Sequence, residues 1–191
     1  MKKIARVFLC VLVALLLALP AGSLAYWNAE KGEMYMEDGE LPTIYGTLNR
    51  RMATREGPST KYREPGTFLQ EGDEVQIISL TYDDNDVPWV QVDFYAGQKH
   101  YRAYTGLKRF DGVEINSIPL EATLGLAVSL TGKVTPRHGP GSDYHEYNFT
   151  LGNSDRTYEM LEAENGYAML QYYAQGEATW YRVWVPMDYV Q

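Results

Sequence analysis

The sequence predicts an all-β protein made of two copies of one small module, preceded by an N-terminal export signal. The first observation is a repeat: Arg55-Glu56-Gly57-Pro58-Ser59 returns further along the chain as Arg137-His138-Gly139-Pro140-Gly141. Second, most of the chain consists of short runs of β-branched and aromatic residues between turn formers, which is typical of strands. Third, helical periodicity is nearly absent after residue 25, so helices are not expected to be the main elements.

The repeat sets the domain organisation. Two pairs of stretches define it: 47–62 aligns with 129–144 without a gap, and 101–104 aligns with 181–184 at nearly the same shift. A fixed period of this kind indicates a repeated structural unit. We therefore predict a first module at 47–110, a linker at 111–128 and a second module at 129–191.

Residues 1–25 have the features of a signal peptide. Lys2, Lys3 and Arg6 give a basic start, and an apolar run follows from residue 7 to residue 19. The stretch 21–25 then offers small residues where a signal peptidase reads, so we expect cleavage after Ala25 and export. The alternative is an uncleaved anchor, because the uncharged stretch that ends at Ala25 is just long enough to span a membrane.

Cysteine content and charge exclude several classes of function. Cys10 is the only cysteine, so the chain after residue 25 would have no disulfide, thiolate metal site or cysteine nucleophile. Removing three basic residues from 17 leaves 14, against 25 acidic residues. Such a surface repels nucleic acid and anionic lipid. We therefore predict no nucleic-acid partner and no membrane contact beyond the signal segment.

The order of strands and turns is predicted to be the same in both modules. Residues 26–46 are acidic and aromatic with several chain breakers, which indicates an irregular lead-in that holds no more than a short strand. Each module then begins with a loop-rich part, at 51–67 and 133–147. The strands are expected at 74–82, 89–94 and 100–104, and at 124–128, 157–161, 167–173 and 180–185. Three short strands joined by tight turns form a meander, so each module is predicted to be a small curled sheet.

Motifs in the same order in both copies resemble those of bacterial SH3 (SH3b) domains. This family carries a V-R-x-G-P-S stretch, a glycine before a β-branched strand, a strand opening on an aromatic residue, and an ending close to G-W-V-x-x-x-Y-L. The matching stretches are 55–59, 72–75, 89–92 and 103–110 in the first copy, and 137–140, 167–170 and 183–190 in the second. The resemblance implies two small SH3-like half-open β-barrels in tandem. It also implies an extracellular binding or targeting module, often for cell-wall peptide or glycan.

Aromatic residues are the candidate ligand-binding side chains. Tyrosine dominates, with 16 residues, and it suits half-buried positions with the ring on an apolar surface and the hydroxyl at the rim. We predict two equivalent aromatic grooves that stack on sugar rings or peptide side chains. Their residues are Tyr62, Trp89, Tyr101 and Tyr104 in the first module, and Tyr144, Tyr167, Tyr181 and Trp184 in the second. The alternative is that most of these rings lie in the core or between the two modules.

The repeated motif itself is predicted to be structural. The five donors of an arginine can hold the carbonyls and carboxylates of its own loop, which is the role expected for Arg55 and Arg137. The alternative role for both is binding of an acidic ligand group. The turn formers of the two motifs, which shape the chain, are Gly57, Pro58, Gly139 and Pro140.

We predict neither a metal site nor catalysis. His138, Asp143, His145 and Glu146 lie close together but match no zinc spacing. The stretch 83–86 is acidic but lacks the central glycine and distal glutamate of a calcium loop, so it predicts a hairpin tip. After residue 25 the chain has no cysteine, no G-x-S-x-G and no H-E-x-x-H. We expect a non-enzymatic protein that needs no cofactor.

The predicted function is binding outside the cytoplasm, in association with the cell envelope. In the first hypothesis the aromatic grooves dock a cell-envelope peptide or glycan of the peptidoglycan kind. In the second, the partner is another exported protein, and the chain is an interaction or assembly subunit.

Overall fold

A computed structural model describes residues 25–28, 33–36, 43–152 and 156–191. The predicted signal peptide lies outside the described residues except for Ala25. The described chain is all-β, with strands and three short 3-10 helices (η), which confirms the all-β part of the predicted fold class. Among the described residues, no helix has the length and apolar character needed to cross a membrane. Residues before 43 and residues 43–191 form separate compact units and are described separately.

The first unit contains a two-stranded hairpin. Strand β1 (Ala25–Asn28) pairs antiparallel with β2 (Glu33–Met36), with Tyr26 opposite Tyr35. The sequence predicted no more than a short strand in this region. Tyrosine and tryptophan favour extended backbone, and this local preference outweighs the chain breakers that surround it.

The first module is a five-stranded antiparallel sheet in the order β8-β7-β6-β3-β9. Its strands are β3 (Ile44–Leu48), β6 (Glu74–Tyr82), β7 (Pro88–Ala96), β8 (Lys99–Gly106) and β9 (Phe110–Asp111). Short strands β4 (Met52–Ala53) and β5 (Phe68–Leu69) pair separately in the loop-rich part, and η1 (Leu107–Arg109) follows β8. All three strands predicted here are confirmed, and β6 has the predicted bounds.

The second module is a four-stranded antiparallel sheet in the order β10-β11-β12-β13. Its strands are β10 (Leu126–Val128), β11 (Tyr158–Glu164), β12 (Tyr167–Ala174) and β13 (Thr179–Pro186), followed by η3 (Met187–Tyr189). Strand β11 continues beyond its predicted end. The turn needs only Asn165 and Gly166, because both have a positive φ, of 51° and 78°. This backbone matches the two-residue turns that follow strand twist.

The two modules repeat one arrangement. Strands β3, β6, β7 and β8 correspond to β10, β11, β12 and β13, and each module ends in a 3-10 turn. Both β6 and β11 carry an irregularity in register, between Ile77 and Ser79 and between Met160 and Glu162. In the first module, residues 48 and 110 form an antiparallel β pair near the two ends of the module. Residues 130 and 190 form the equivalent pair in the second module, as the sequence repeat requires. The strands of the described residues form several sheets and no closed barrel.

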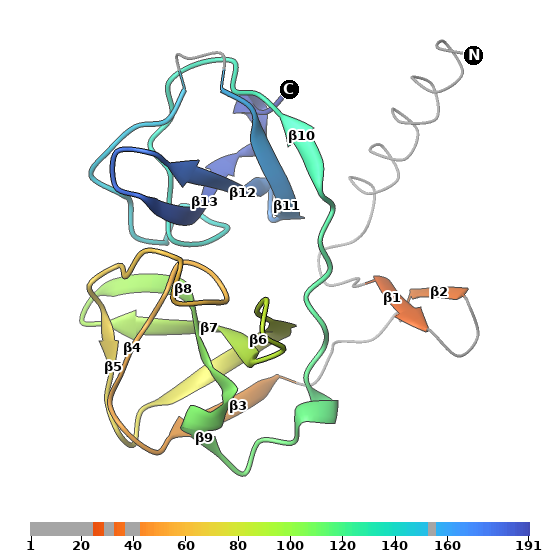
Figure 1. The fold of residues 1–191 in the computed structure, drawn as a ribbon, viewed down its shortest axis with the longest axis vertical. Coiled ribbons are helices and arrows are strands. Elements are labelled where there is room, and N and C mark those ends of the chain that lie inside the picture. Colours follow the sequence, from red (N-terminus) through yellow and green to blue (C-terminus); the bar gives the residue numbers. More distant parts are fainter. Residues whose placement is uncertain (1–24, 29–32, 37–42, 153–155) are drawn as a thin grey trace. The chain divides into compact units, whose positions relative to one another are not determined.

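The strands of the two modules form separate groups in Figure 1. Each module has its own hydrophobic core. In the first, alternate side chains of β6 and β7 are buried with Leu48, Leu69 and Phe110. In the second, Leu130, Val134 and Leu151 from the segment between β10 and β11 pack with residues of β11, β12 and β13. Alternating burial leaves the other face of each sheet available for contacts outside its own core.

The predicted linker is attached to the first module along part of its length. It contains η2 (Ile115–Ser117) and then runs beside β6, where Leu80 N donates to Pro119 O at 2.8 Å and Glu121 N donates to Leu80 O at 2.7 Å. These bonds fix the position from which the Glu121 side chain enters the space between the modules.

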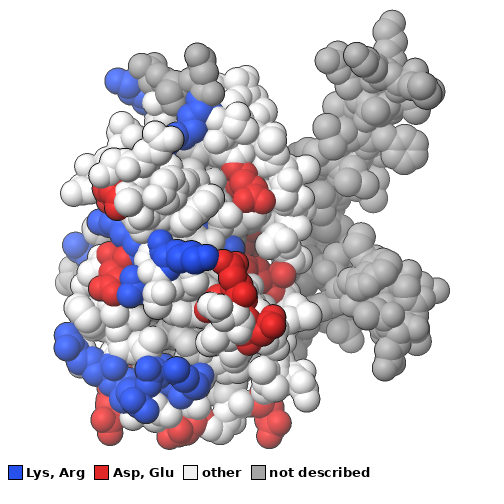
Figure 2. All heavy atoms as spheres, in the orientation of Figure 1, with Lys and Arg blue, Asp and Glu red and all other residues white. Residues whose placement is uncertain are grey.

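Charges of both signs are mixed on the face of residues 43–191 shown in Figure 2. A group of Lys and Arg side chains lies at the end where β3 and β9 are found, and acidic side chains lie beside it. This face therefore offers no purely basic surface of the kind that binds nucleic acid.

Candidate functional site

The arginines of the repeated motif hold their own loops in the same way in both modules. Arg55 Nη1 donates to the carbonyls of residues 60 and 62, at 3.5 and 3.1 Å. Arg137 Nη1 donates to the carbonyls of residues 142 and 144, at 2.8 and 2.7 Å. Each also pairs with a glutamate at the end of its loop, at 2.5 Å. The donors of these guanidinium groups are therefore used inside the loop.

The motif glycines make room for a tyrosine ring. A Cβ atom at Gly57 would lie closer than 3.0 Å to the ring of Tyr62, and one at Gly139 would lie equally close to the ring of Tyr144. Contacts this short do not occur in folded proteins, so each glycine is required by space. The tyrosine that each loop positions then reaches the other module.

Main-chain pairs join the two modules in a pseudo-twofold arrangement. Tyr62 forms a parallel bridge with Trp180, and Tyr144 forms one with His100. The hydrogen bonds at these bridges run from Arg63 N to Trp180 O, at 3.0 Å, and from His145 N to His100 O, at 2.9 Å. Positions 144 and 180 are the repeat equivalents of positions 62 and 100. Each module therefore contacts the other through the same surface, as the two subunits of a symmetric dimer do.

Two buried arginines lie in this contact, which we call the seam. Its central side chains are Tyr62, Asp93, Arg102, Tyr104, Glu121, Tyr144, Glu164, Gln171 and Arg182. Arg102 donates to both carboxylate oxygens of Asp93 at 2.9 Å, and it also pairs with Glu164. Tyr144 Oη donates to the same Asp93, at 2.9 Å, which links the second module to the first.

Arg182 occupies the equivalent place in the second module. Its Nη1 lies 2.9 Å from Glu121 Oε1, and its Nε donates to Gln171 Oε1 at 2.9 Å. The side chains of Arg182 and Glu121 are only 8% and 2% exposed. The Arg182 guanidinium also lies over the rings of Tyr62 and Tyr104, at 5.3 and 5.2 Å. Its charge is compensated by a carboxylate, an amide and two aromatic rings.

Exclusion of water at and near the seam changes the pKa of several groups. Burial alone would lower the pKa of Arg182, but Tyr104 and Glu121 raise it above its usual range. Burial raises the pKa of Glu162 to about 7, and the neighbouring Glu164 adds to this shift. Burial likewise raises the pKa of Glu56 to about 7, although Arg63, at 2.8 Å, opposes the shift. Ionic contacts in such a region depend on every partner being present.

The eight aromatic residues predicted to form grooves are not brought together as an exposed surface. Six are at most 7% exposed, namely Trp89, Tyr101, Tyr104, Tyr144, Tyr181 and Trp184. The other two, Tyr62 and Tyr167, are half-buried. Tyr101 and Tyr181 lie in the two cores, whereas Tyr104 and Tyr144 lie in the seam. Their large apolar area is used in packing, which agrees with the alternative drawn from the sequence.

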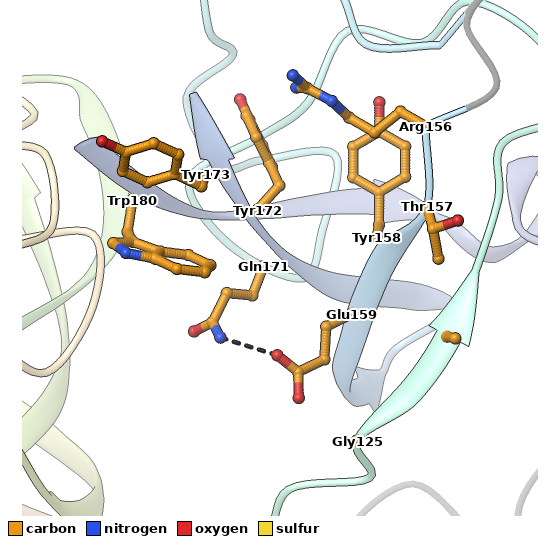
Figure 3. Close-up of a pocket in the computed structure, with 10 residues that line it drawn as sticks. Gly125, Arg156, Thr157, Tyr158, Glu159, Gln171, Tyr172, Tyr173 and Trp180 are labelled. Atoms are coloured by element: carbon orange, nitrogen blue, oxygen red, sulfur yellow. Dashed lines mark hydrogen bonds between the residues drawn. The ribbon is translucent and has the colours of Figure 1, made fainter. Parts of the chain in front are cut away.

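A pocket does open on the second module's sheet, and we call it the sheet pocket (Figure 3). It is lined by Gly125, Ala127, Arg156, Thr157, Tyr158, Glu159, Gln171, Tyr172, Tyr173 and Trp180. These residues come from β10–β13 and from the segments just before β10 and β11. The volume of about 460 Å³ falls within the range of small-molecule sites.

Aromatic and polar side chains are mixed in the sheet pocket, and both kinds are found on each side of the strands (Figure 3). Tyr173 and Trp180 lie next to each other with ring centroids 5.4 Å apart and planes tilted by 57°. Gln171 Nε2 donates to Glu159 Oε2 at 2.9 Å, and this bond joins side chains of the neighbouring strands β12 and β11 (Figure 3). The guanidinium of Arg156 lies 5.3 Å from the centre of the Tyr172 ring. The site thus combines a ring surface with hydrogen-bonding groups.

The seam fixes the orientation of Gln171. Its Oε1 accepts from Tyr62 Oη at 2.6 Å and from Arg182 Nε at 2.9 Å. Both partners are donors here, so the amide nitrogen must be the atom that faces Glu159 and the pocket. A residue of the first module therefore positions a polar group of the second.

Sequence reasoning missed the residues of the sheet pocket. Among the predicted site residues, Tyr62 contributes to the pocket indirectly, because its hydroxyl holds the Gln171 side chain. The alternation of Trp180, Arg182 and Trp184 on one face of β13 was a signal in the sequence. This alternation did not predict the register of β12 with β13, which places Tyr173 beside Trp180.

The two groups weighed as metal sites have other roles. Among residues 43–152 and 156–191, no cluster of three or more His, Asp or Glu side chains is placed to hold a metal ion. Burial lowers the pKa of His138 to about 3, and its ring stacks on Tyr147 with centroids 3.8 Å apart. Asp83 Oδ1 accepts from the amides of Asn85 and Val87, which confirms the predicted hairpin tip.

No protein-family model, curated protein or solved structure matches the chain.

Proposed function

We propose that this protein is an exported, non-catalytic binding protein, built from two SH3b-like modules, that docks a peptide or glycan of the cell envelope. The sheet pocket is the proposed contact. The observation that carries the proposal is the side-by-side arrangement of an aromatic pair, Tyr173 and Trp180, and a hydrogen-bonded polar pair, Gln171 and Glu159. Such a mixture is typical of sites that hold a partly apolar, partly polar ligand.

The seam supports this proposal by making the site rigid before a ligand arrives. Trp180 N donates to Lys61 O at 3.2 Å, and Tyr62 holds Gln171, so two elements of the pocket are fixed from the first module. A site whose groups are already ordered loses less conformational entropy when it binds. The predicted export signal supports a location where envelope polymers are within reach.

Cosedimentation with purified sacculi tests the proposal. The protein, its Tyr173→Ala variant and its Tyr95→Ala variant are compared, each with and without calcium. Tyr95 is the matched control, because it faces His100 in the first module as Tyr173 faces Trp180 in the second. We expect the wild-type protein and Tyr95→Ala to sediment and Tyr173→Ala to remain largely soluble. The proposal is contradicted if the wild type does not sediment, or if both variants sediment as the wild type does.

A second candidate function is that of an interaction subunit for another exported protein. It is favoured by the exposure of Tyr45 and Tyr95, at 57% and 68%, on the first module's sheet. Exposed tyrosines are frequent anchors of protein–protein contacts. A stable protein partner that is captured by wild type and lost with Tyr95→Ala, together with no binding to sacculi, supports this function instead.

A further inference from the structure

The two charged side chains of the sheet pocket lie on different sides of it. Arg156 brings one positive charge and Glu159 one negative charge. Figure 3 shows the Arg156 guanidinium beside Tyr172, on the opposite side of the strands from Glu159, so a ligand next to Gln171 and Trp180 meets the negative charge of Glu159. Because Arg156 already lies over Tyr172, that ring does not offer a free face to a ligand cation. The side of the pocket that holds Gln171 and Trp180 therefore disfavours an anionic ligand.

The neutral groups of the pocket define the ligand further. Trp180 and Tyr173 present ring surface, which packs on flat apolar groups. Gln171 has a second amide hydrogen and Glu159 has a second carboxylate oxygen, beyond the bond that joins them. A pyranose ring has an apolar C–H face and a rim of hydroxyl groups, so it meets both requirements at once.

The first module provides an internal comparison for this pocket. The equivalent cross-strand positions there hold Tyr45, Gln76, Asp93, Tyr95 and His100, where the second module has Ala127, Glu159, Gln171, Tyr173 and Trp180. The largest difference in size is at Ala127, whose methyl group stands where the first module has a tyrosine. The exposed position of Ala127 on β10, at the edge of the sheet, leaves the space above Glu159 open.

We propose that the sheet pocket binds a neutral sugar ring of a glycan, stacked on Trp180 and Tyr173, and that Ala127 is the residue that makes room for it. This inference rests on the proposed function and specifies its ligand. Glu159 and Gln171 accept from and donate to the hydroxyl or acetamido groups at the rim of the sugar. Tyr62 positions Gln171 without touching the ligand.

Titration with defined tetrasaccharides tests the proposal. The probes are neutral oligomers of glucose, N-acetylglucosamine, mannose and galactose, with tetragalacturonate as an anionic probe and tetralysine as a cationic probe. Binding is followed by tryptophan fluorescence and calorimetry. We expect at least one neutral oligomer to bind and both charged probes to bind at least tenfold more weakly, because Glu159 repels the anionic probe and tetralysine has no ring to pack on Trp180 and Tyr173. Glu159→Gln is expected to weaken the neutral oligomer about tenfold, since a hydrogen bond to a charged group is lost.

Ala127→Tyr is the decisive variant, with Tyr45→Ala as its matched control. Both positions are exposed, and tyrosine suits a strand, so thermal unfolding should show that both variants fold. We expect Ala127→Tyr to weaken the neutral oligomer more than tenfold and Tyr45→Ala to leave it unchanged. An unchanged affinity in Ala127→Tyr overturns the inference, and so does binding of charged probes alone.

The sacculus experiment separates failure of this inference from failure of the proposed function. If the protein sediments with sacculi through Tyr173 but binds none of the neutral oligomers, the sugar assignment is wrong and the binding function stands. If it binds neither sacculi nor oligomers, both proposals are wrong.

Discussion

Replacing Arg182 with methionine should strongly destabilise the protein. Methionine keeps much of the side chain's apolar length but removes the charge that faces Glu121. The Glu121 carboxylate, only 2% exposed, then keeps the Tyr104 hydroxyl as its remaining partner in the seam. Removing one member of a buried ion pair costs about 3–5 kcal/mol, because the other charge stays buried without compensation.

The expected size of this effect can be checked by unfolding the protein in urea and by heat. For a chain of this size, 1 kcal/mol corresponds to a change in Tm of about 2–4 °C, so Arg182→Met should lower Tm by about 6–20 °C. The matched control is Arg51→Met. Arg51 is exposed and lies 4.1 Å from the Phe68 ring, outside the seam, and such a contact is worth about 0.5–1 kcal/mol.

A paired substitution distinguishes loss of charge compensation from loss of packing. Arg182→Met combined with Glu121→Leu removes both charges, and replacing a whole buried pair by apolar groups is often close to neutral. We expect the double variant to be more stable than Arg182→Met alone. The reasoning is refuted if Arg182→Met unfolds within about 1 kcal/mol of the wild type, well below the cost expected for an unpaired buried charge, or if the double variant is the less stable of the two.

Three further predictions address the loops, the pH dependence and the pocket. Gly139→Ala should lower the free energy of unfolding in urea by about 1–3 kcal/mol, because its Cβ would overlap the Tyr144 ring. The control is Gly176→Ala, which should be neutral because nothing lies within 4 Å of its Cβ. Equal effects of the two substitutions would contradict the steric argument. Burial raises the pKa of Glu56 from 4.5 to about 7, so the stability contributed by this group is present below about pH 4.5 and lost as the pH rises through 7. The wild type should therefore lose stability between pH 5 and 8 while Glu56→Gln does not, so the unfolding free energy of the variant minus that of the wild type should increase by up to about 3 kcal/mol. A constant difference would show that Glu56 does not titrate in this range. Tyr62→Phe should weaken ligand binding several-fold in calorimetry and leave the tryptophan fluorescence of the free protein unchanged, because Gln171 loses one of its two donors and keeps the other, Arg182. An unchanged affinity would remove Tyr62 from the site.

Much of the fold was predictable from local signals. Strand β6 was predicted with its observed bounds because β-branched residues from Glu74 to Tyr82 lie between a Gly-Asp turn and an acidic tip. The internal repeat predicted which elements correspond, and the β pairs near the ends of both modules fall at equivalent positions of the two copies. The predicted end of β11 was too early, because the turn is made by Asn165 and Gly166 alone rather than by the whole stretch 162–166.

The candidate site was less predictable, because it depends on contacts between distant strands. Aromatic residues were chosen by their order in the motifs, and most of these rings are buried in the cores or the seam. The same composition is compatible with either location, since sequence alone does not give the face on which two modules meet. Tyr173, Trp180 and Gln171 become a site only through the register of β12 with β13 and the reach of Tyr62 across the seam.

The most direct test of the account is an NMR titration of the isotope-labelled protein with soluble fragments released from purified sacculi. The account predicts that chemical shifts change first at the indole N–H of Trp180, the side-chain amide of Gln171 and the backbone amide of Ala127. The corresponding residues of the first module, Tyr45, Asp93 and His100, should be unaffected. Changes centred on the first module's sheet, or no changes at saturating fragment concentration, would contradict it.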